Sequence, residues 1–144
     1  MEADLFGGWT DEARAVITGA MRNARARAST CIGLRDVALA TADADSVRTL
    51  HRMAGFQPNV VWEAAGTVRT HGADDAPVRD LTPEAREAIA DAAATASAMS
   101  HAAVRPQHLW LSLLARAPVR AALASHQISA DSLAAAVRST LLES

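Results

Sequence analysis

Apolar side chains recur every three or four positions along much of the chain, with polar residues between them. In the stretch that follows Thr10 they stand at Ile17, Ala20, Met21 and Ala24. This spacing places them on one face of a helix of 3.6 residues per turn, while the remaining positions face solvent. The pattern therefore predicts an amphipathic helix with one buried stripe.

The same pattern begins again 72 residues further along the chain. The sequence TDEAR at 10–14 returns as TPEAR at 82–86, and eight of the seventeen pairs from 10/82 to 26/98 are identical. Four of these identities are Ala on Ala, which carry little weight in an Ala-rich chain. A fixed register that continues through several elements without a gap indicates a duplicated structural unit. The four informative identities are Thr10/Thr82, Glu12/Glu84, Arg14/Arg86 and Ile17/Ile89.

Each unit is predicted to contain four helices. Thr10 and Thr82 are N-cap candidates, because their hydroxyls can accept hydrogen bonds from the free amides of the first helical turn. Pro83 stands at the first helical position, where its missing N–H costs nothing. The second helices are the most apolar, at 34–40 and 106–114; the third span 45–53 and 117–126, and the fourth 58–68 and 129–142, with Ser129 as a further cap candidate.

The chain is thus predicted to be all-α, with about eight helices arranged as a pseudo-twofold duplication of a four-helix repeat. A chain of 144 residues that folds as one domain buries roughly 68–70% of its unfolded surface. The segment 69–80 is rich in Gly, Pro and Asp, which is typical of a linker. The predicted organisation is a single domain over 1–144, with repeat 1 at 9–68, the linker at 69–80 and repeat 2 at 81–144.

Composition favours the same fold and a cytoplasmic location. Ala accounts for 35 residues, aromatic residues for only 3%, and Tyr is absent, so strand-forming residues are scarce. The net charge is −2 and all 14 basic residues are Arg, so the chain has no overall attraction to nucleic acid or to an anionic membrane. Cys31 is the one cysteine and cannot form an internal disulfide, which is typical of a reducing compartment. No apolar run approaches the ~18 residues of a membrane span, and the acidic N-terminus is unlike a signal peptide.

The sequence contains no catalytic or metal-binding pattern. It has no Lys and so cannot contain the phosphate-binding loop of an ATPase, and it has no Gly-x-Ser-x-Gly elbow. The five histidines lack the spacing of a zinc site, and we interpret them as surface or hydrogen-bonded side chains rather than metal ligands. Cys31 could be a nucleophile, but a small buried side chain is the favoured interpretation. The sequence therefore predicts no enzyme, no metal and no cofactor.

A nucleic-acid interface would have to begin at one early helix, where four arginines are crowded together. The acidic balance of the chain, the missing Lys and the lack of interleaved aromatic residues favour a solvated basic face instead. No nucleic-acid partner is therefore predicted. The four residues are Arg14, Arg22, Arg25 and Arg27.

The three tryptophans are interpreted in two ways. Trp62 and Trp110 fall on apolar helix faces and are predicted to lie in the core. Trp9 stands just before a helix cap, beside Phe6 and a Gly-Gly pair. An aromatic side chain there can staple the helix start or remain partly open to a ligand, and the pattern supports both interpretations equally.

The paired pattern resembles the Clp N-terminal domain, which sits in front of the ATPase rings of ClpA- and ClpC-type unfoldases. The resemblance runs from Phe6 to about Leu142 and is carried by LFGGWTDEARAVI and CIGLRDVAL in the first half, and by LTPEAREAI and VRPQHLWLSLL in the second. It implies a non-catalytic module that binds peptides or proteins of the Clp proteolysis system. Such a module could act as an adaptor, competitor or decoy of a ClpC-type unfoldase, or could be the excised substrate-recognition domain of a full-length Clp ATPase.

The resemblance also implies ligand-binding residues. In ClpC-type domains a groove between the first helices of the two repeats binds macrocyclic peptide antibiotics, and a Thr and a Glu hold phosphoarginine. Arg35 and Gln107 stand here at the positions of that Glu, so weaker phosphoarginine binding is expected. The pseudo-twofold axis is expected to bring the two helix openings to the two sides of one surface. The residues carried over are Phe6, Trp9, Thr10, Arg14, Ile17 and Met21 from the first repeat, and Leu81, Thr82, Arg86 and Ile89 from the second.

Overall fold

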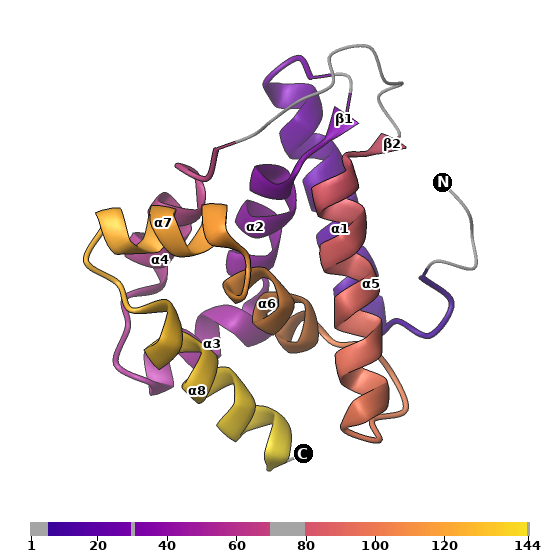
Figure 1. Ribbon diagram of the computed structural model, residues 1–144, viewed down its shortest axis with the longest axis vertical. Helices are drawn as coiled ribbons and strands as arrows, with labels where there is room; N and C mark the ends of the chain where they lie inside the picture. Colours follow the sequence, from indigo (N-terminus) through magenta and orange to yellow (C-terminus); the bar gives the residue numbers. More distant parts are fainter. Residues whose placement is uncertain (1–5, 30, 70–79, 144) are drawn as a thin grey trace.

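The computed structural model describes residues 6–29, 31–69 and 80–143, and within them the chain forms eight helices and two very short strands (Figure 1). The predicted all-α fold is confirmed. Residues 70–79 of the predicted linker lie outside the described residues. The first half contains α1 (Asp11–Ala26), β1 (Cys31–Ile32), α2 (Leu34–Ala42), α3 (Asp45–Met53) and α4 (Pro58–Ala65), and the second contains β2 (Asp80–Leu81), α5 (Pro83–Ala98), α6 (Pro106–Leu114), α7 (Ala117–Ser125) and α8 (Ala130–Leu142).

The helices follow the repeat register that the sequence indicated. The first three helices of each half begin and end 72 residues apart, and α4 and α8 begin 72 residues apart. The last pair differs in length, since α4 ends at Ala65 whereas α8 continues to Leu142. The predicted fourth helix was therefore three residues too long in the first half, where Gly66 ends it. The chain is a duplicated four-helix unit.

The predicted caps are present at the helix starts. The Thr10 hydroxyl oxygen accepts a hydrogen bond from the Ala13 amide at 3.1 Å, and that of Thr82 accepts one from the Ala85 amide at 3.2 Å. Pro83 opens α5, as predicted. Each cap satisfies one of the amides that a helix start leaves free, and such a cap is typically worth about 1 kcal/mol.

The two halves are joined by short parallel backbone pairings that the composition did not predict. Ile32 of β1 pairs with Leu81 of β2, and an isolated bridge joins Trp9 to Val104. These two pairings are equivalent in the repeat register. In each of them the segment before the first helix of one repeat contacts the segment before the second helix of the other. The backbone N–H of Thr10 donates to the Val104 carbonyl at 3.0 Å, and that of Thr82 donates to the Ile32 carbonyl at 2.9 Å.

These pairings fix the relative direction of the two long helices. The Trp9 bridge places the start of α1 beside the segment that follows α5, and the β1–β2 pairing places the start of α5 beside the segment that follows α1. The helices α1 and α5 therefore run antiparallel, with β1 and β2 at one end of the pair (Figure 1). Because α1 has 16 residues, the two helix starts are about 24 Å apart along the helix axis.

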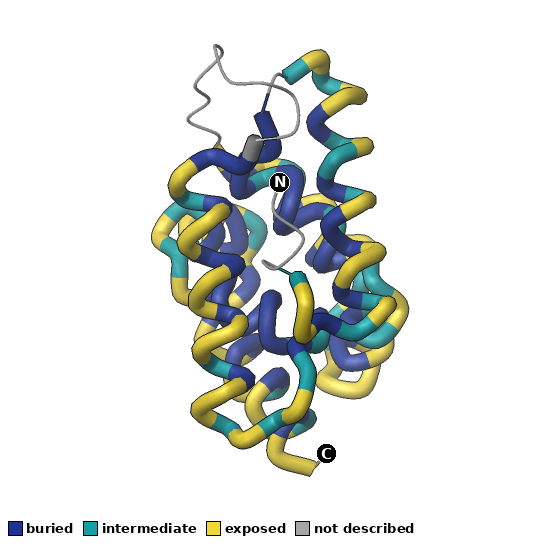
Figure 2. Tube along the Cα trace, turned by 90° about the vertical axis from the view of Figure 1, so that its right-hand side faces the viewer, coloured by how far each residue is buried: buried dark blue, intermediate teal, exposed yellow. Residues whose placement is uncertain are grey.

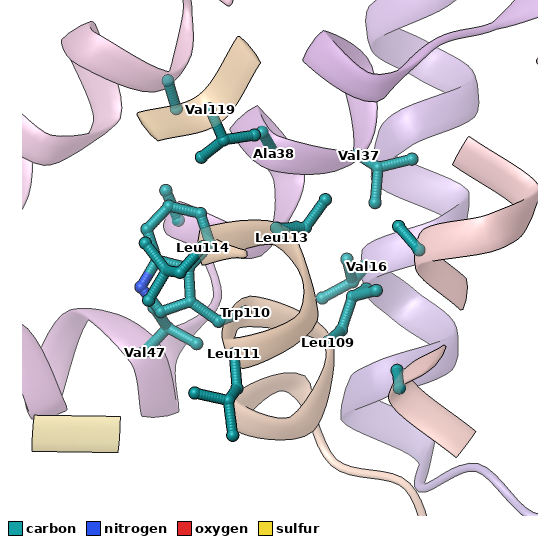
Figure 3. Close-up of a cluster of buried hydrophobic side chains, with 14 of the residues drawn as sticks. Val16, Val37, Ala38, Val47, Leu109, Trp110, Leu111, Leu113, Leu114 and Val119 are labelled. Atoms are coloured by element: carbon teal, nitrogen blue, oxygen red, sulfur yellow. The ribbon is translucent and has the colours of Figure 1, made fainter. Parts of the chain in front are cut away.

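The centre of the core is α6, as its apolar sequence predicts. Leu109, Trp110, Leu113 and Leu114 are all fully or almost fully buried. Figure 3 shows α6 between side chains from other helices, with Trp110 lying close to Val47 of α3. Figure 2 shows the same arrangement for the whole molecule, with buried stretches inside and exposed helix faces outside. The prediction that Trp110 belongs to the core is confirmed.

Trp62 is the clear exception among the predicted core residues. Its side chain is 43% exposed, so the prediction that it belongs to the core was wrong. The helix α4 buries Val61, Ala64 and Ala65, and these three residues define a helix face that does not include position 62. The packed counterpart of Trp62 in the second repeat is Ala134, so the equivalent space accommodates only a small side chain.

Cys31 is buried in β1, which confirms its interpretation as a small buried side chain. Among the helices that the structure describes, none combines the length and the apolar character needed to cross a membrane.

Candidate functional site

The start of α1 presents one aromatic side chain over another. Trp9 is 5% exposed, and the partly exposed Phe6 packs against it edge to face, with ring centroids 5.0 Å apart. Arg14 holds this turn in place, since its guanidinium donates to the Phe6 and Gly7 carbonyls at 3.3 Å each. Of the two interpretations of Trp9, the staple describes its burial, and Phe6 is the aromatic that remains accessible.

The other residues expected to bind a ligand differ widely in exposure. Thr10 and Met21 are partly exposed and Arg86 is exposed, and the guanidinium of Arg86 makes no hydrogen bond or ion pair with any residue that the structure describes. The structure places the two helix openings at opposite ends of the α1–α5 pair and not beside each other. The accessible residues are therefore spread along that pair. The expected residues that are buried, besides Trp9, are Ile17, Leu81, Thr82 and Ile89.

The third residue of α2 is a buried acid with a structural role. Both oxygens of the Asp36 carboxylate accept hydrogen bonds from Arg27, at 2.8 and 2.6 Å. One oxygen also accepts from the Gly33 amide at 2.8 Å, which caps the start of α2. A fully buried carboxylate needs such partners, because an unpaired charge is costly away from water. Asp36 and Arg27 thus stabilise the fold and are occupied by each other.

A histidine takes the equivalent position in the second repeat. The Arg105 amide donates to Nδ1 of the buried His108 at 2.9 Å, so the proton of the neutral ring is on Nε2. That nitrogen lies 2.7 Å from Nδ1 of His101 and donates to it. Burial, with smaller contributions from His101 and Arg105, lowers the pKa of His108 from 6.5 to about 4. His108 is therefore neutral at physiological pH and caps the start of α6.

Among the residues that the structure describes, His51 is the other histidine that is fully buried, and it is hydrogen-bonded as well. The Trp110 indole N–H donates to Nε2 of the buried His51 at 3.0 Å, so His51 is hydrogen-bonded inside the core. Within the described parts of the chain no three His, Cys, Asp or Glu side chains gather closely enough to hold a metal ion.

Arg35 and Gln107, which the resemblance aligns with a Glu, differ in their surroundings. Nε of Arg35 donates to the Gly66 carbonyl at 2.7 Å, which ties this arginine to the end of α4. The side-chain oxygen of Gln107 is buried and finds no hydrogen-bond partner among the described residues. Position 35 therefore carries a cation and position 107 a neutral amide.

Two grooves related by the repeat register open between the first and second helices of each half. The α1–α2 groove has a volume of about 430 Å³, and the α5–α6 groove about 530 Å³. Six lining positions are equivalent in the two grooves. The α1–α2 groove also reaches Trp62 of α4, whereas the α5–α6 groove reaches Arg138 of α8. The linings include Gly19, Asn23, Leu39 and Ala40 in the α1–α2 groove, and Asp91, Thr95, Leu111 and Ser112 in the α5–α6 groove.

An arginine of the second repeat forms ion pairs beside its groove and has no counterpart in the first repeat. Arg116, the N-cap residue of α7, forms ion pairs with Glu87, at 3.7 Å, and with Asp91, both on α5. The first repeat has Ala44, Ala15 and Gly19 at the three equivalent positions. The α1–α2 groove was not predicted from the sequence. The repeat register does contain a signal for it, since it pairs Trp62 with an alanine and these three small residues with Arg116 and its two acidic partners.

Comparisons with known proteins agree with this architecture. Residues 80–143 match the family described as the Clp repeat (R) N-terminal domain. The fold is similar to that of the Hsp104 N-terminal domain from Candida albicans, with a TM-score of 0.76 and 16% identity over 90% of this chain and 88% of that one. It is also similar to the N-terminal domain of the chaperone ClpD from Arabidopsis thaliana, with a TM-score of 0.77 and 14% identity over 98% and 99% of the two chains.

A third similar structure is a complex of the ClpV N-domain with a VipB peptide, with a TM-score of 0.71 and 16% identity over 100% of this chain and 94% of that one. At these identities the structural likeness shows the fold. No curated protein matches the sequence.

Proposed function

We propose that the chain is a Clp N-terminal repeat domain that binds peptides and proteins of a Clp proteolysis system in the cytoplasm. The family match over residues 80–143 and the similarity in fold along nearly the whole chain support this. In this role it acts without catalysis, as an adaptor, a competitor for substrates or a decoy of a ClpC-type unfoldase. A Clp N-domain by itself is a non-catalytic binding module, and such domains bind peptides, as the ClpV complex illustrates.

The observation that carries this proposal is the accessible aromatic at the start of α1. Phe6 rests on the buried Trp9, so its ring is held in place before any ligand arrives. A ligand covering Phe6 would meet little entropic cost from ordering it, which is the advantage of a preorganised contact. Arg14 is exposed beside it and fixes the backbone turn.

Macrocyclic peptide antibiotics directed at the unfoldase are the ligand class that fits this surface best. At the start of α1 Phe6 offers an apolar ring and Arg14 an exposed guanidinium, whereas Met21 and Arg86 lie farther along the α1–α5 pair. A rigid ring of apolar residues with outward-facing carbonyls matches that combination. Sequestration of such a peptide would protect the unfoldase.

A competition assay tests the proposed role. A ClpC-type unfoldase with its peptidase degrades an unfolded substrate, and increasing amounts of the protein are added. We expect degradation to slow in a saturable way, because the added domain binds substrate without unfolding it. In the presence of an inhibitory macrocyclic peptide we expect the opposite, a recovery of degradation. Unchanged degradation at large excess, with and without the peptide, would contradict the adaptor, competitor and decoy roles.

The alternative in which the chain is the recognition domain of a longer Clp ATPase keeps the same binding surface. The length of the open reading frame distinguishes the two. The structure gives less support than the sequence to the alternative in which the arginines of the first helix bind nucleic acid. Two of the four crowded arginines are engaged, since Arg14 donates to backbone carbonyls and Arg27 pairs with Asp36.

A further inference from the structure

The duplication provides an internal reference for each groove. The two repeats share their helices and their register, so a difference between equivalent positions is a property of one repeat and not of the fold. In the second repeat Arg116 forms ion pairs with Glu87 and with Asp91, and Asp91 lines the α5–α6 groove. In the first repeat the same positions are Ala44, Ala15 and Gly19, and Trp62 lies at the edge.

The exposed Trp62 side chain indicates that the α1–α2 groove is a binding site and not merely a gap in the packing. A tryptophan side chain that is 43% exposed leaves a large apolar surface in water, which a chain of 3% aromatic residues could have avoided with alanine. The second repeat has that alanine, at Ala134. The small residues on the groove wall let another backbone approach closely beside the indole ring.

The charges around the groove favour a cation. Glu12, Asp43 and Asp45 line it, against a single basic residue, Arg22. The Glu12 carboxylate accepts from the Ser46 amide at 3.0 Å, and Asp43 lies 3.5 Å from Arg48, which also donates to Asn59. The carboxylate of Asp45 makes no hydrogen bond or ion pair with any described residue. Even with Arg48 counted, the groove keeps one excess negative charge, next to an aromatic ring.

We propose that the α1–α2 groove is a second peptide-binding site, and that it selects a segment in which an unmodified arginine is flanked by apolar side chains. The guanidinium would stack on the Trp62 ring and reach the carboxylate of Asp45, while an apolar neighbour packs against Leu39 and the small residues of α1. Arginine suits this site because its planar cation is weakly hydrated and stacks on aromatic faces. The inference rests on the proposed peptide-binding function and adds the chemical class of the bound segment.

The site differs in place and chemistry from the surface around Phe6. That surface lies at the start of α1 and offers arginine donors, whereas the α1–α2 groove offers carboxylates and an indole ring. The two sites can therefore be tested separately with the same protein.

The test uses a fluorescently labelled peptide of sequence Leu-Ala-Arg-Leu-Leu-Ala-Arg-Leu, blocked at both ends, and a matched peptide with Glu in place of each Arg. Binding is followed by anisotropy at two salt concentrations. We expect the Arg peptide to bind the wild-type protein, the Glu peptide to bind at least about tenfold more weakly, and added salt to weaken the Arg complex. Equal binding of both peptides, or no binding of the Arg peptide up to about 1 mM, would overturn the proposal.

Variants of the protein then locate the site. Trp62→Ala introduces the residue that the second repeat already has, so we expect it to fold normally and to lose about tenfold in affinity for the Arg peptide. Gly19→Asp combined with Ala44→Arg builds the second repeat's ion pair into the first, and we expect a similar loss. Phe6→Ala serves as the matched control and should bind the Arg peptide as the wild type does.

These outcomes separate the inference from the proposed function. If Phe6→Ala loses the Arg peptide and Trp62→Ala keeps it, the peptide binds at the start of α1, the α1–α2 groove is refuted as its site, and the general binding function survives. If neither substitution affects a peptide that does bind, both assigned surfaces are wrong.

Discussion

Acidification should destabilise this protein well above the pH at which its carboxylates titrate, because two buried histidines must remain neutral. Burial is the largest cause in both cases: the pKa of His51 falls from 6.5 to about 4, with a smaller contribution from Arg48, and the pKa of His108 also falls to about 4. The unfolded chain binds a proton at each histidine near pH 6.5, whereas the folded chain does not until about pH 4. Stability is therefore fully present above pH 6.5 and is lost as the pH falls toward 4.

The size of the effect follows from the shift. Each pKa unit corresponds to 1.36 kcal/mol, so a shift from 6.5 to about 4 amounts to roughly 3 kcal/mol per histidine once the loss is complete. At pH 5 about 2 kcal/mol per histidine should already be lost, or roughly 4 kcal/mol for the two together. A domain of this size has a total stability of about 5–15 kcal/mol, so the protein should be markedly weakened at pH 5.

Urea unfolding at pH 7, 6 and 5, followed by tryptophan fluorescence, measures this loss. Two substitutions replace a histidine by the residue at the equivalent position of the other repeat, or by one similar to it. His51→Leu introduces the residue found at Leu123, and His108→Asn keeps an acceptor for the Arg105 amide without a titratable group. Each should remove about half of the pH dependence, whatever it does to stability at pH 7. A wild-type protein equally stable at pH 7 and pH 5, or a double variant with the full wild-type slope, would refute the reasoning.

Three further outcomes follow from the same contacts. Arg27→Ala should cost about 3 kcal/mol in urea unfolding, because it leaves the buried carboxylate of Asp36 without its cation; a loss below about 1 kcal/mol would contradict the pairing. Gly19→Ala should raise the free energy of unfolding by about 0.5–1 kcal/mol, since the added Cβ meets only an alanine Cβ at 3.4 Å, and a lower melting temperature would argue against this. An arginine-phosphorylated substrate protein should bind weakly to this domain. The double substitution of Arg35 and Gln107 to Glu should strengthen that binding about tenfold per site, as measured by calorimetry. Micromolar binding of the substrate by the wild type would contradict the expectation.

The helices and their starts could be predicted because their signals are local. The hydroxyls of Thr10 and Thr82 contact amides three residues away, and Pro83 acts at its own position. The repeat register added longer-range information, since a cap found in one half supported a cap in the other. The same locality explains what was missed. The pairings of Ile32 with Leu81 and of Trp9 with Val104 join distant segments only one or two residues long, which show no strand pattern.

The site was less predictable than the fold because exposure depends on packing between elements. Trp62 was predicted to lie on an apolar helix face, but its position in α4 is off the face that Val61 and Ala64 define. Trp9 precedes a helix and could face either way, and only the bridge to Val104 fixes it inside. The antiparallel course of α1 and α5 separates the two helix openings, and nothing in a single repeat specifies that course.

A calorimetric titration of a ClpC-directed macrocyclic peptide into the wild-type protein and into Phe6→Ala tests the central claim most directly. Phe6 is partly exposed, so its loss should leave the domain folded, whereas Trp110→Ala, which empties the core beside α6, should not. We predict that the wild type binds the peptide and that Phe6→Ala binds roughly thirtyfold more weakly, as expected for the loss of an aromatic anchor worth about 2 kcal/mol. Binding by Phe6→Ala as tight as that of the wild type would contradict the assignment of the binding surface to the start of α1.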